Sequence, residues 1–250
     1  MLKLHNYWSS VCSQKVRICL AEKNLAYENH HVNLFEFDHW TPAYLKLNPK
    51  AVVPALDHDG RVVIEPNVIL EYLEDCFPQV RLRPGDAYAR TQMRLWMFNS
   101  EEIAHENVNT CSYNPRHAAR HKAKGHTKDD LKRMAMNCPN PIIRNRLLHR
   151  AEHGVSEAEE GQAYEALDFL LDKMEESLGQ GPWLAGSEYS LGDIAMAPFI
   201  NRIEVLKRPE MVGAARRPKL AEWWQRIQAR PAFKDAFSVK NPDTSDPVQR

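Results

Sequence analysis

Three serines and a cysteine lie close together near the amino terminus. Ser9, Ser10, Cys12 and Ser13 follow a short apolar stretch and precede a run whose spacing predicts a helix. The first amides of a helix are unpaired and carry the positive end of its dipole, so they stabilise a nearby anion. A thiol at this turn, whether of the protein or of a bound substrate, would therefore ionise more readily. The pattern predicts a site that holds a thiolate.

A proline interrupts the apolar run that ends at Leu56. Pro54 has no amide proton to give to a sheet, so it belongs at the mouth of a strand, and a cis Val53-Pro54 bond would explain its place. The backbone amide and carbonyl of Val53 would then have no partner in the sheet. An extended peptide could pair with them by adding a short strand.

A second helix start follows a hairpin signal at Asp59-Gly60. Glu65, Pro66 and Asn67 open this helix, and its free amides attract an anion. Proline is well suited to the first helical position. A peptide edge at Val53 beside this helix start indicates a pocket for a small peptide that carries a carboxylate.

The helices and strands that must position these residues are of two kinds, and the pattern changes near residue 80. We expect a strand at 2–6, a helix from about 13 to 24, a strand at 27–33, the hairpin, and a helix that ends before Phe77. A β-α-β unit, an antiparallel hairpin and a closing helix make a thioredoxin-like domain over residues 1–80. The fold class is therefore α/β followed by an all-α part.

The second part, residues 86–237, has helical signals throughout. Long helices are expected at 87–107 and 156–178, and Ser190 and Asp193 have the spacing of a capping box. Residues 238–250 are polar and contain prolines, which predicts a loose tail.

Composition excludes several function classes. The 250 residues carry 33 basic and 33 acidic side chains, which argues against general nucleic-acid binding. No apolar run is long enough to span a membrane. The five cysteines are odd in number and have no paired spacing, which favours a reduced, cytoplasmic setting and no metal site. The histidines at positions 30, 31, 117, 121 and 126 are expected at the surface.

Several motifs resemble those of the soluble glutathione transferases. In the first part these are Asn48-Pro49, 53–56 and 65–73; in the second they are 183–195 and the final helix around Trp223-Trp224 and 230–233. The resemblance implies a thioredoxin-like domain followed by the helical bundle of that family, a homodimer, and glutathione as cosubstrate. Where the family has a Glu-Ser pair that holds the γ-glutamyl end of glutathione, this chain has Glu65 followed by Pro66.

The resemblance also implies roles for the first cluster. Val53 would pair its backbone with the cysteinyl part of glutathione, with Pro54, Glu65, Pro66 and Asn67 around it. Ser10 would donate its hydroxyl to the glutathione thiolate, although a serine here is also a typical helix cap. Ser9 and Ser13 are alternative hydroxyl donors.

The order Ser-x-Cys-Ser is similar to the zeta class and to the reductive dehalogenases of chlorinated hydroquinones. Cys12 would then resolve a mixed disulfide with glutathione; a small packing residue is the equally weighted alternative. Other segments, including 58–63, 71–75 and 229–232, resemble the bacterial β-etherases that cleave aryl ethers with glutathione. The implied enzyme is a glutathione S-transferase that attacks an electrophilic, aromatic small molecule. The alternative is a non-catalytic protein of this fold that acts as an interaction module.

The substrate pocket is expected between the two parts. Its predicted walls are Trp8, Asn109 and Tyr113, which suit a planar aromatic substrate. The segment 116–150 is rich in Arg, Lys and His, a pattern typical of a solvated helical surface. A second interpretation is that this segment attracts acidic substrates.

Overall fold

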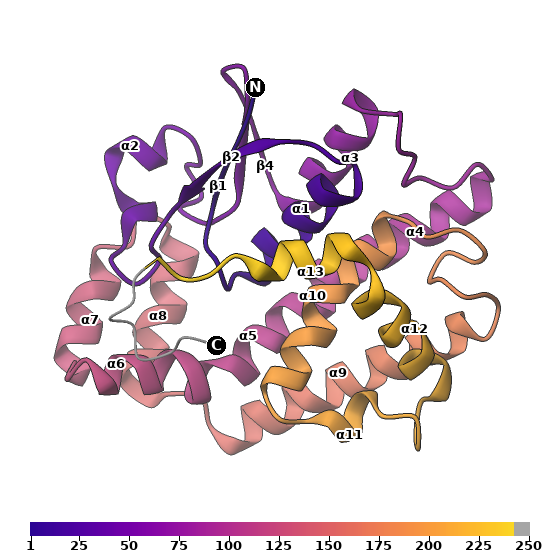
Figure 1. Ribbon diagram of the computed structural model, residues 1–250. Coiled ribbons are helices and arrows are strands. Elements are labelled where there is room, and N and C mark those ends of the chain that lie inside the picture. Colours follow the sequence, from indigo (N-terminus) through magenta and orange to yellow (C-terminus); the bar gives the residue numbers. More distant parts are fainter. Residues whose placement is uncertain (243–250) are drawn as a thin grey trace.

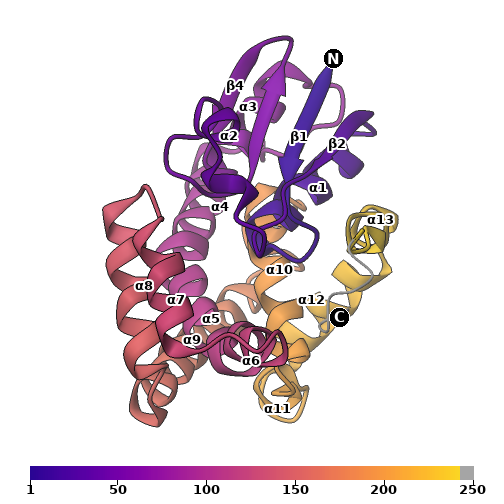
Figure 2. The ribbon, with the colours of Figure 1, turned by 90° about the vertical axis from the view of Figure 1, so that its left-hand side faces the viewer.

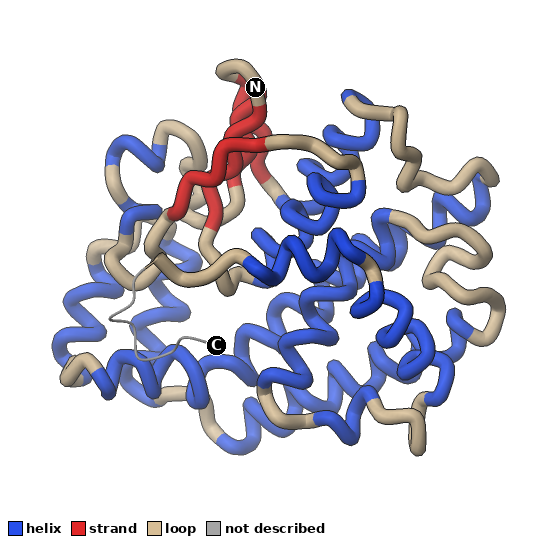
Figure 3. The backbone as a smooth tube through the Cα atoms, in the orientation of Figure 1, coloured by secondary structure: helices blue, strands red, loops and turns tan. Residues whose placement is uncertain are grey.

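The first strand lies in the middle of a four-stranded mixed sheet. The structure, a computed structural model, describes residues 1–242. β1 (Leu2–Asn6) pairs in parallel with β2 (Tyr27–His31) and antiparallel with β3 (Ala55–His58), and β4 (Arg61–Ile64) completes the order β2-β1-β3-β4. The strands gather at one end of the molecule (Figure 3). The predicted thioredoxin-like arrangement is confirmed.

Two helices pack together against this sheet. They are α1 (Val11–Glu22) and α3 (Pro66–Cys76), and their apolar side chains share one core with Leu2, Leu4 and Leu56 of the strands. A short 3-10 turn, η1 (Asp38–Trp40), and α2 (Pro42–Leu45) follow β2. Helix α1 begins two residues before the predicted start because Ser10 caps it, and β2 ends two residues before the predicted end.

The rest of the described chain is helical and lies below the sheet in Figure 2. Its elements are α4 (Ala87–Asn99), η2 (Ser100–His105), α5 (Glu106–Ser112), η3 (Tyr113–Ala118), α6 (Ala119–Ala123), α7 (Lys128–Met136), α8 (Pro141–His153), α9 (Glu157–Leu178), α10 (Leu191–Val205), α11 (Pro209–Val212), α12 (Pro218–Ala229) and α13 (Pro231–Ser238).

One helix of this half is longer than the sequence predicts. The chain remains helical from Ala87 to Ala123, through two π-helical stretches, η2 and η3. A π-helical stretch widens a helix locally and is frequent at functional sites. Both stretches contribute side chains to the cavity described below.

The basic segment 116–150 is the largest departure from the sequence interpretation. It forms the end of η3, then α6, and most of the hairpin of α7 and α8. The hairpin lies under the α2 region in both views (Figures 1 and 2), and Lys124 Nζ contacts Glu36 at 2.8 Å. Arg120 and Arg150 are buried, so this segment is only partly a solvated surface.

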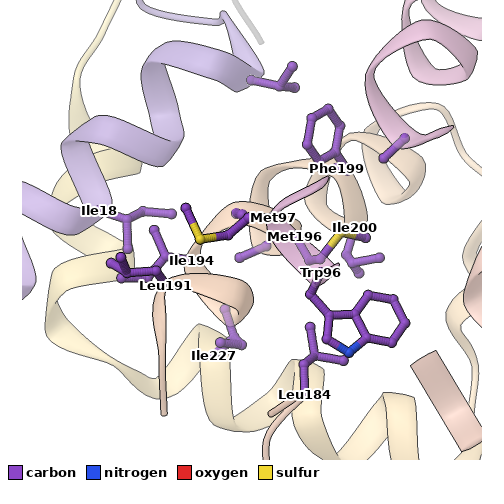
Figure 4. Close-up of a cluster of buried hydrophobic side chains, with 14 of the residues drawn as sticks. Ile18, Trp96, Met97, Leu184, Leu191, Ile194, Met196, Phe199, Ile200 and Ile227 are labelled. Atoms are coloured by element: carbon purple, nitrogen blue, oxygen red, sulfur yellow. The ribbon is translucent and has the colours of Figure 1, made fainter. Parts of the chain in front are cut away.

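Helix α10 is the hydrophobic centre that joins the two halves. Figure 4 shows its residues Ile194, Met196 and Phe199 among side chains of α1 and α4, with Ile227 of α12 nearby. Helix α13 returns to pack on α1, where Arg17 Nε donates to the Ala236 carbonyl at 2.9 Å. The N-terminal half therefore rests on a preformed apolar surface.

The predicted capping box at the start of α10 is present. Ser190 accepts from the Gly192 amide, and the buried Asp193 carboxylate accepts from the Ser190 amide at 2.9 Å. The same carboxylate also accepts from the Leu184 amide at 3.0 Å and from Trp223 Nε1 at 2.8 Å. Asp193 thus ties together three segments of the helical half.

Two expectations from the sequence concern the C-terminal tail and the absence of a membrane-spanning segment. Most of the predicted tail, residues 243–250, lies outside the described residues, and Asn241 is buried. Within residues 1–242 no helix is both long and apolar enough to cross a membrane.

Candidate functional site

A cavity of about 530 Å³ lies between the two halves. Its walls come from the loop after β1, the segment before β3, the start of α3, both π-helical stretches and the α7–α8 hairpin. Predicted site residues on these walls are Ser9, Ser10, Cys12, Val53, Pro54, Glu65, Pro66, Asn109 and Tyr113. The tertiary structure therefore brings most of the predicted site together.

Ser10 is the N-cap of α1. Its Oγ accepts from the Ser13 amide at 3.3 Å, and its carbonyl accepts from the Gln14 amide at 2.9 Å. The hydroxyl proton of Ser10 has no acceptor within residues 1–242, and the side chain faces the cavity. Capping therefore leaves this hydroxyl free to donate to an anion at the helix start.

Two buried arginines hold the loop that presents Ser10. Arg17 of α1 donates to the Trp8 carbonyl at 2.7 Å, and Arg202 of α10 donates to the Ser9 carbonyl at 2.6 Å. Burial lowers the pKa of Arg17 to about 10 and that of Arg202 to about 9. Both remain cationic at neutral pH and add positive charge behind the turn.

The Val53-Pro54 bond is cis, as predicted. Tyr44 Oη and Asn48 Nδ2 each donate to the preceding Val52 carbonyl at 2.7 Å, which fixes this loop. No hydrogen bond among the described residues uses the amide or carbonyl of Val53, which lines the cavity. The predicted free edge for an extended peptide is present.

The start of α3 supplies a carboxylate and free amides. Glu65 has a φ of 70°, and its carboxylate contacts Lys50 Nζ at 2.8 Å. Pro66 occupies the first helical position, and no side chain caps this end of the helix. The amides that follow are open to an anionic ligand.

Cys12 faces a histidine and a glutamate of η2 across the cavity. Cys12 Sγ, a ring nitrogen of His105 and a carboxylate oxygen of Glu101 all lie within 4.8 Å of one another. The negative charge of the Cys12 thiolate raises the pKa of the His105 imidazole to about 9, and a hydrogen bond with Cys12 and the charge of Glu101 add to this, against burial. Below a pH of about 9 the arrangement therefore places a protonated imidazole beside Cys12 Sγ.

These three residue types are also metal ligands. However, Glu101 Oε1 lies 2.6 Å from Nζ of Lys15, a fully buried lysine that also donates to Ser100 Oγ at 2.8 Å. An ammonium ion in this place repels a divalent cation. The Lys15 ammonium group therefore disfavours a metal ion at this cluster.

Three of the predicted site residues lie outside the cavity. Ser13 is fully buried, and its Oγ accepts from the Tyr7 amide at 3.3 Å. Asn67 turns toward α4 and donates to the Met97 carbonyl at 2.6 Å. Trp8 packs with Tyr7 and Val53 and borders a smaller, separate cavity of about 230 Å³. Each of these side chains contacts other residues of the protein outside the cavity.

The far wall of the cavity is aromatic. His117 stacks on Phe35 with a centroid distance of 6.0 Å and on Tyr113 at 6.3 Å. His121 also lines the cavity. His117 and His121 were expected at the surface, but both are half-buried and line the cavity.

Sequence reasoning missed residues that only the fold brings to the site. Arg120 Nη1 donates to Tyr7 Oη at 3.0 Å and lies 3.6 Å above the Phe35 ring. His105, Glu101, Arg150 and Arg202 also line the cavity. For Arg120 and Arg150 the available signal was the basic segment 116–150, in its second interpretation as a segment that attracts acidic substrates.

Two family models match the chain. The glutathione S-transferase N-terminal domain matches residues 9–76, and the glutathione S-transferase C-terminal domain matches residues 141–231.

Individual proteins match over nearly the whole chain. Protein LigF of Sphingobium sp. is 33% identical over 94% of this chain and 93% of that protein. The crystal structure of the β-etherase LigF superposes with a TM-score of 0.85 at 30% identity, covering 95% of this chain and 98% of that one. The tetrachloro-p-hydroquinone reductive dehalogenase of Sphingobium chlorophenolicum is 28% identical over 96% of this chain and 97% of that protein.

Proposed function

Because the chain belongs to the glutathione transferase superfamily, we propose that it binds glutathione as a cosubstrate and activates its thiolate to attack an electrophilic, aromatic small molecule. The observation that carries this proposal is the free Ser10 hydroxyl, which faces the same cavity as the unpaired backbone of Val53. The Ser10 hydroxyl suits a sulfur anion, and the backbone of Val53 suits an extended peptide.

The residues around the cavity fit the parts of glutathione. Val53 would pair with the cysteinyl backbone, and Glu65 with the free amides of α3 would hold the γ-glutamyl end. A hydroxyl at the position of Pro66, which the family usually has, is absent here. Bound glutathione supplies the thiolate nucleophile.

The chain would act on that thiolate through charge and hydrogen bonding. Ser10 donates its hydroxyl, the N-terminus of α1 adds its dipole, and Arg202 adds a buried cation behind Ser9. These groups stabilise the thiolate over the thiol, so more of the nucleophile is ionised at neutral pH. In a substitution, the carbon–sulfur bond forms as the bond to a phenolate or halide breaks.

Cleavage of an aryl ether is the reaction that we favour. LigF, which is described as a β-etherase, matches this chain in sequence and superposes on it. In this reaction the leaving group is a phenolate, and no protein nucleophile is required. The protein would then act in the degradation of aromatic compounds.

Reductive dehalogenation is a second candidate, favoured by the pair of Cys12 and His105. The Cys12 thiolate would attack the sulfur of a glutathione–aromatic conjugate. The aryl carbon would leave with the bonding electrons and take a proton, and the mixed disulfide at Cys12 would be released by a second glutathione. His105 would stabilise the Cys12 thiolate and supply the proton.

Titration calorimetry tests the first step. Both glutathione and S-methylglutathione, which has no thiol, should bind. Only bound glutathione should develop the ultraviolet absorbance of a thiolate. An aryl ether and a chlorinated hydroquinone then separate the two reactions, since only the second should need Cys12. Absence of binding at millimolar glutathione would overturn the proposal and favour the interaction module.

We also propose a cytoplasmic homodimer that uses the face formed by β4, α3 and α4. Large apolar side chains are exposed there, among them Val68, Tyr88, Leu95 and Phe98. The free cysteines are consistent with a reducing compartment. Sedimentation should give twice the chain mass for the natural protein and a monomer for Phe98→Glu. A natural protein that sediments as a monomer would contradict the dimer.

A further inference from the structure

Five arginines line the wall of the cavity beyond Ser10. Arg120, Arg150 and Arg202 are buried, and Arg116 and Arg146 are partly exposed. The two acids among the lining residues already have cations: Glu65 contacts Lys50 at 2.8 Å, and Glu101 contacts Lys15 at 2.6 Å. Neither acid makes an ion pair with Arg150 or Arg202.

Arg150 has neutral hydrogen-bond partners. It is 8% exposed and donates to Asn109 Oδ1 at 3.2 Å and to Thr110 Oγ1 at 3.4 Å, and its guanidinium lies 5.0 Å from the Tyr113 ring. No carboxylate of residues 1–242 lies within ion-pair distance of it. Burial first, and then the charge of Arg146, lowers the pKa of Arg150.

Arg202 is in the same situation. It is also 8% exposed, and its hydrogen bond to the Ser9 carbonyl is to a neutral group. Burial lowers the pKa of Arg202, and the charge of Arg116, which has the same sign, lowers it further. By contrast, Arg146 of the same wall contacts Glu106 at 3.0 Å. A buried cation without a counter-ion is destabilising unless a ligand supplies the opposite charge.

The charges of three of these arginines act on the imidazole of His117. Burial and the charges of Arg202, Arg116 and Arg150 lower the pKa of its imidazole to about 3. The ring therefore stays neutral, and it stacks between Phe35 and Tyr113. This aromatic cluster lies beside Arg150, whose guanidinium is 5.0 Å from the Tyr113 ring.

We propose that this wall is an anion subsite and that the electrophile is an aromatic compound that carries a carboxylate, bound by Arg150 and Arg202 while its ring lies against Tyr113 and His117. The inference rests on the proposed function and adds the charge of the substrate to it. A bidentate guanidinium–carboxylate contact would give both affinity and orientation. The carboxylate of glutathione itself is the competing source of the anion.

The test compares two matched electrophiles, para-chloro-meta-nitrobenzoate and the corresponding benzamide. With each, the thiolate sulfur of glutathione displaces chloride. Each kcat/KM is divided by the rate of the uncatalysed reaction with glutathione, which removes the difference in intrinsic reactivity. We expect a preference of about tenfold or more for the carboxylate.

Substitution of Arg150 tests whether this residue causes the preference for the carboxylate. Arg150→Gln should reduce it about tenfold. Arg150→Lys keeps the charge but loses the bidentate contact, so it should keep part of the preference. The matched control Arg133→Gln on the exposed face of α7 should leave it unchanged. Circular dichroism verifies that each variant is folded. A loss in Arg150→Lys as complete as in Arg150→Gln would overturn the role of this charge.

The outcomes separate the inference from the proposed function. Failure to convert either electrophile speaks against the transferase itself. Conversion of both with no preference overturns the anion subsite and leaves the transferase intact. If Arg150→Gln weakens calorimetric binding of glutathione and lowers both rates equally, the anion is that of glutathione, and the inference is wrong.

Discussion

The thiol of Cys12 lies within 4.8 Å of the imidazole of His105. Cys12 stands in the first turn of α1, and His105 ends the π-helical stretch η2, so the pair exists only when the two halves of the protein are packed together. Lys15 holds Glu101 beside them through a contact of 2.6 Å. We propose on this basis that Cys12 has a chemical role in addition to its packing.

The first prediction concerns the reactivity of Cys12. At pH 7, His105→Gln should slow alkylation of Cys12 by iodoacetamide about tenfold, because the imidazolium that stabilises the thiolate is lost. The pKa of His105 is raised to about 9, so the histidine is protonated below that value and neutral above it. The difference between the natural protein and the variant should therefore narrow as the pH rises through 9.

Mass spectrometry of the labelled peptides gives this rate for each cysteine. Cys76, which is exposed, is the internal reference and should react equally in both proteins. Equal Cys12 rates in the two proteins at pH 7 would show that the pair does not ionise the thiol.

The second prediction separates the two roles of Ser10. Ser10→Ala should lower kcat/KM about 100- to 1,000-fold, by loss of a donor to the thiolate, and should lower the free energy of unfolding by about 1 kcal/mol, by loss of the cap. Ser10→Asp keeps the cap but repels the thiolate, so it should be inactive and normally stable. Activity retained in Ser10→Ala would assign the hydroxyl to Ser9.

The third prediction concerns Pro66, which stands where the family usually has a serine. Pro66→Ser restores a hydroxyl at the start of α3 and should tighten glutathione binding about threefold to tenfold. The free energy of unfolding should fall by up to about 1 kcal/mol, because proline restricts the unfolded chain. Calorimetry and urea denaturation measure the two effects. Unchanged affinity would show that the amides of α3 already satisfy the ligand.

The fourth prediction concerns stability. Asp193→Ala leaves the Trp223 indole, the Leu184 amide and the Ser190 amide without their buried acceptor. Each unpaired group costs about 1–3 kcal/mol, so we expect a loss of about 3–5 kcal/mol. The exposed acid Asp129 of α7 is the control, and Asp129→Ala should change stability little. A loss below about 1 kcal/mol for Asp193→Ala would contradict the structural role of this carboxylate.

Local patterns determined much of the fold and part of the site. The strand at Leu2–Asn6, the helix that ends at Cys76 and the box of Ser190 and Asp193 follow from apolar spacing and from capping chemistry, which act over a few residues. The cis bond before Pro54 was predicted because a proline cannot serve a sheet in that place. Such features need no knowledge of distant neighbours.

Tertiary structure decided which side chains face the cavity. Ser10 and Ser13 are equivalent in the sequence, but the cap turns Ser10 outward and buries Ser13 under Tyr7. His105 reaches Cys12, and Arg202 reaches Ser9, only because α10 and η2 pack against α1. The sequence by itself determined the family motifs, the helix that carries the thiol site and the peptide edge. The long-range packing determined the charge around them, because electrostatic partners are selected by distance in space and not by separation along the chain.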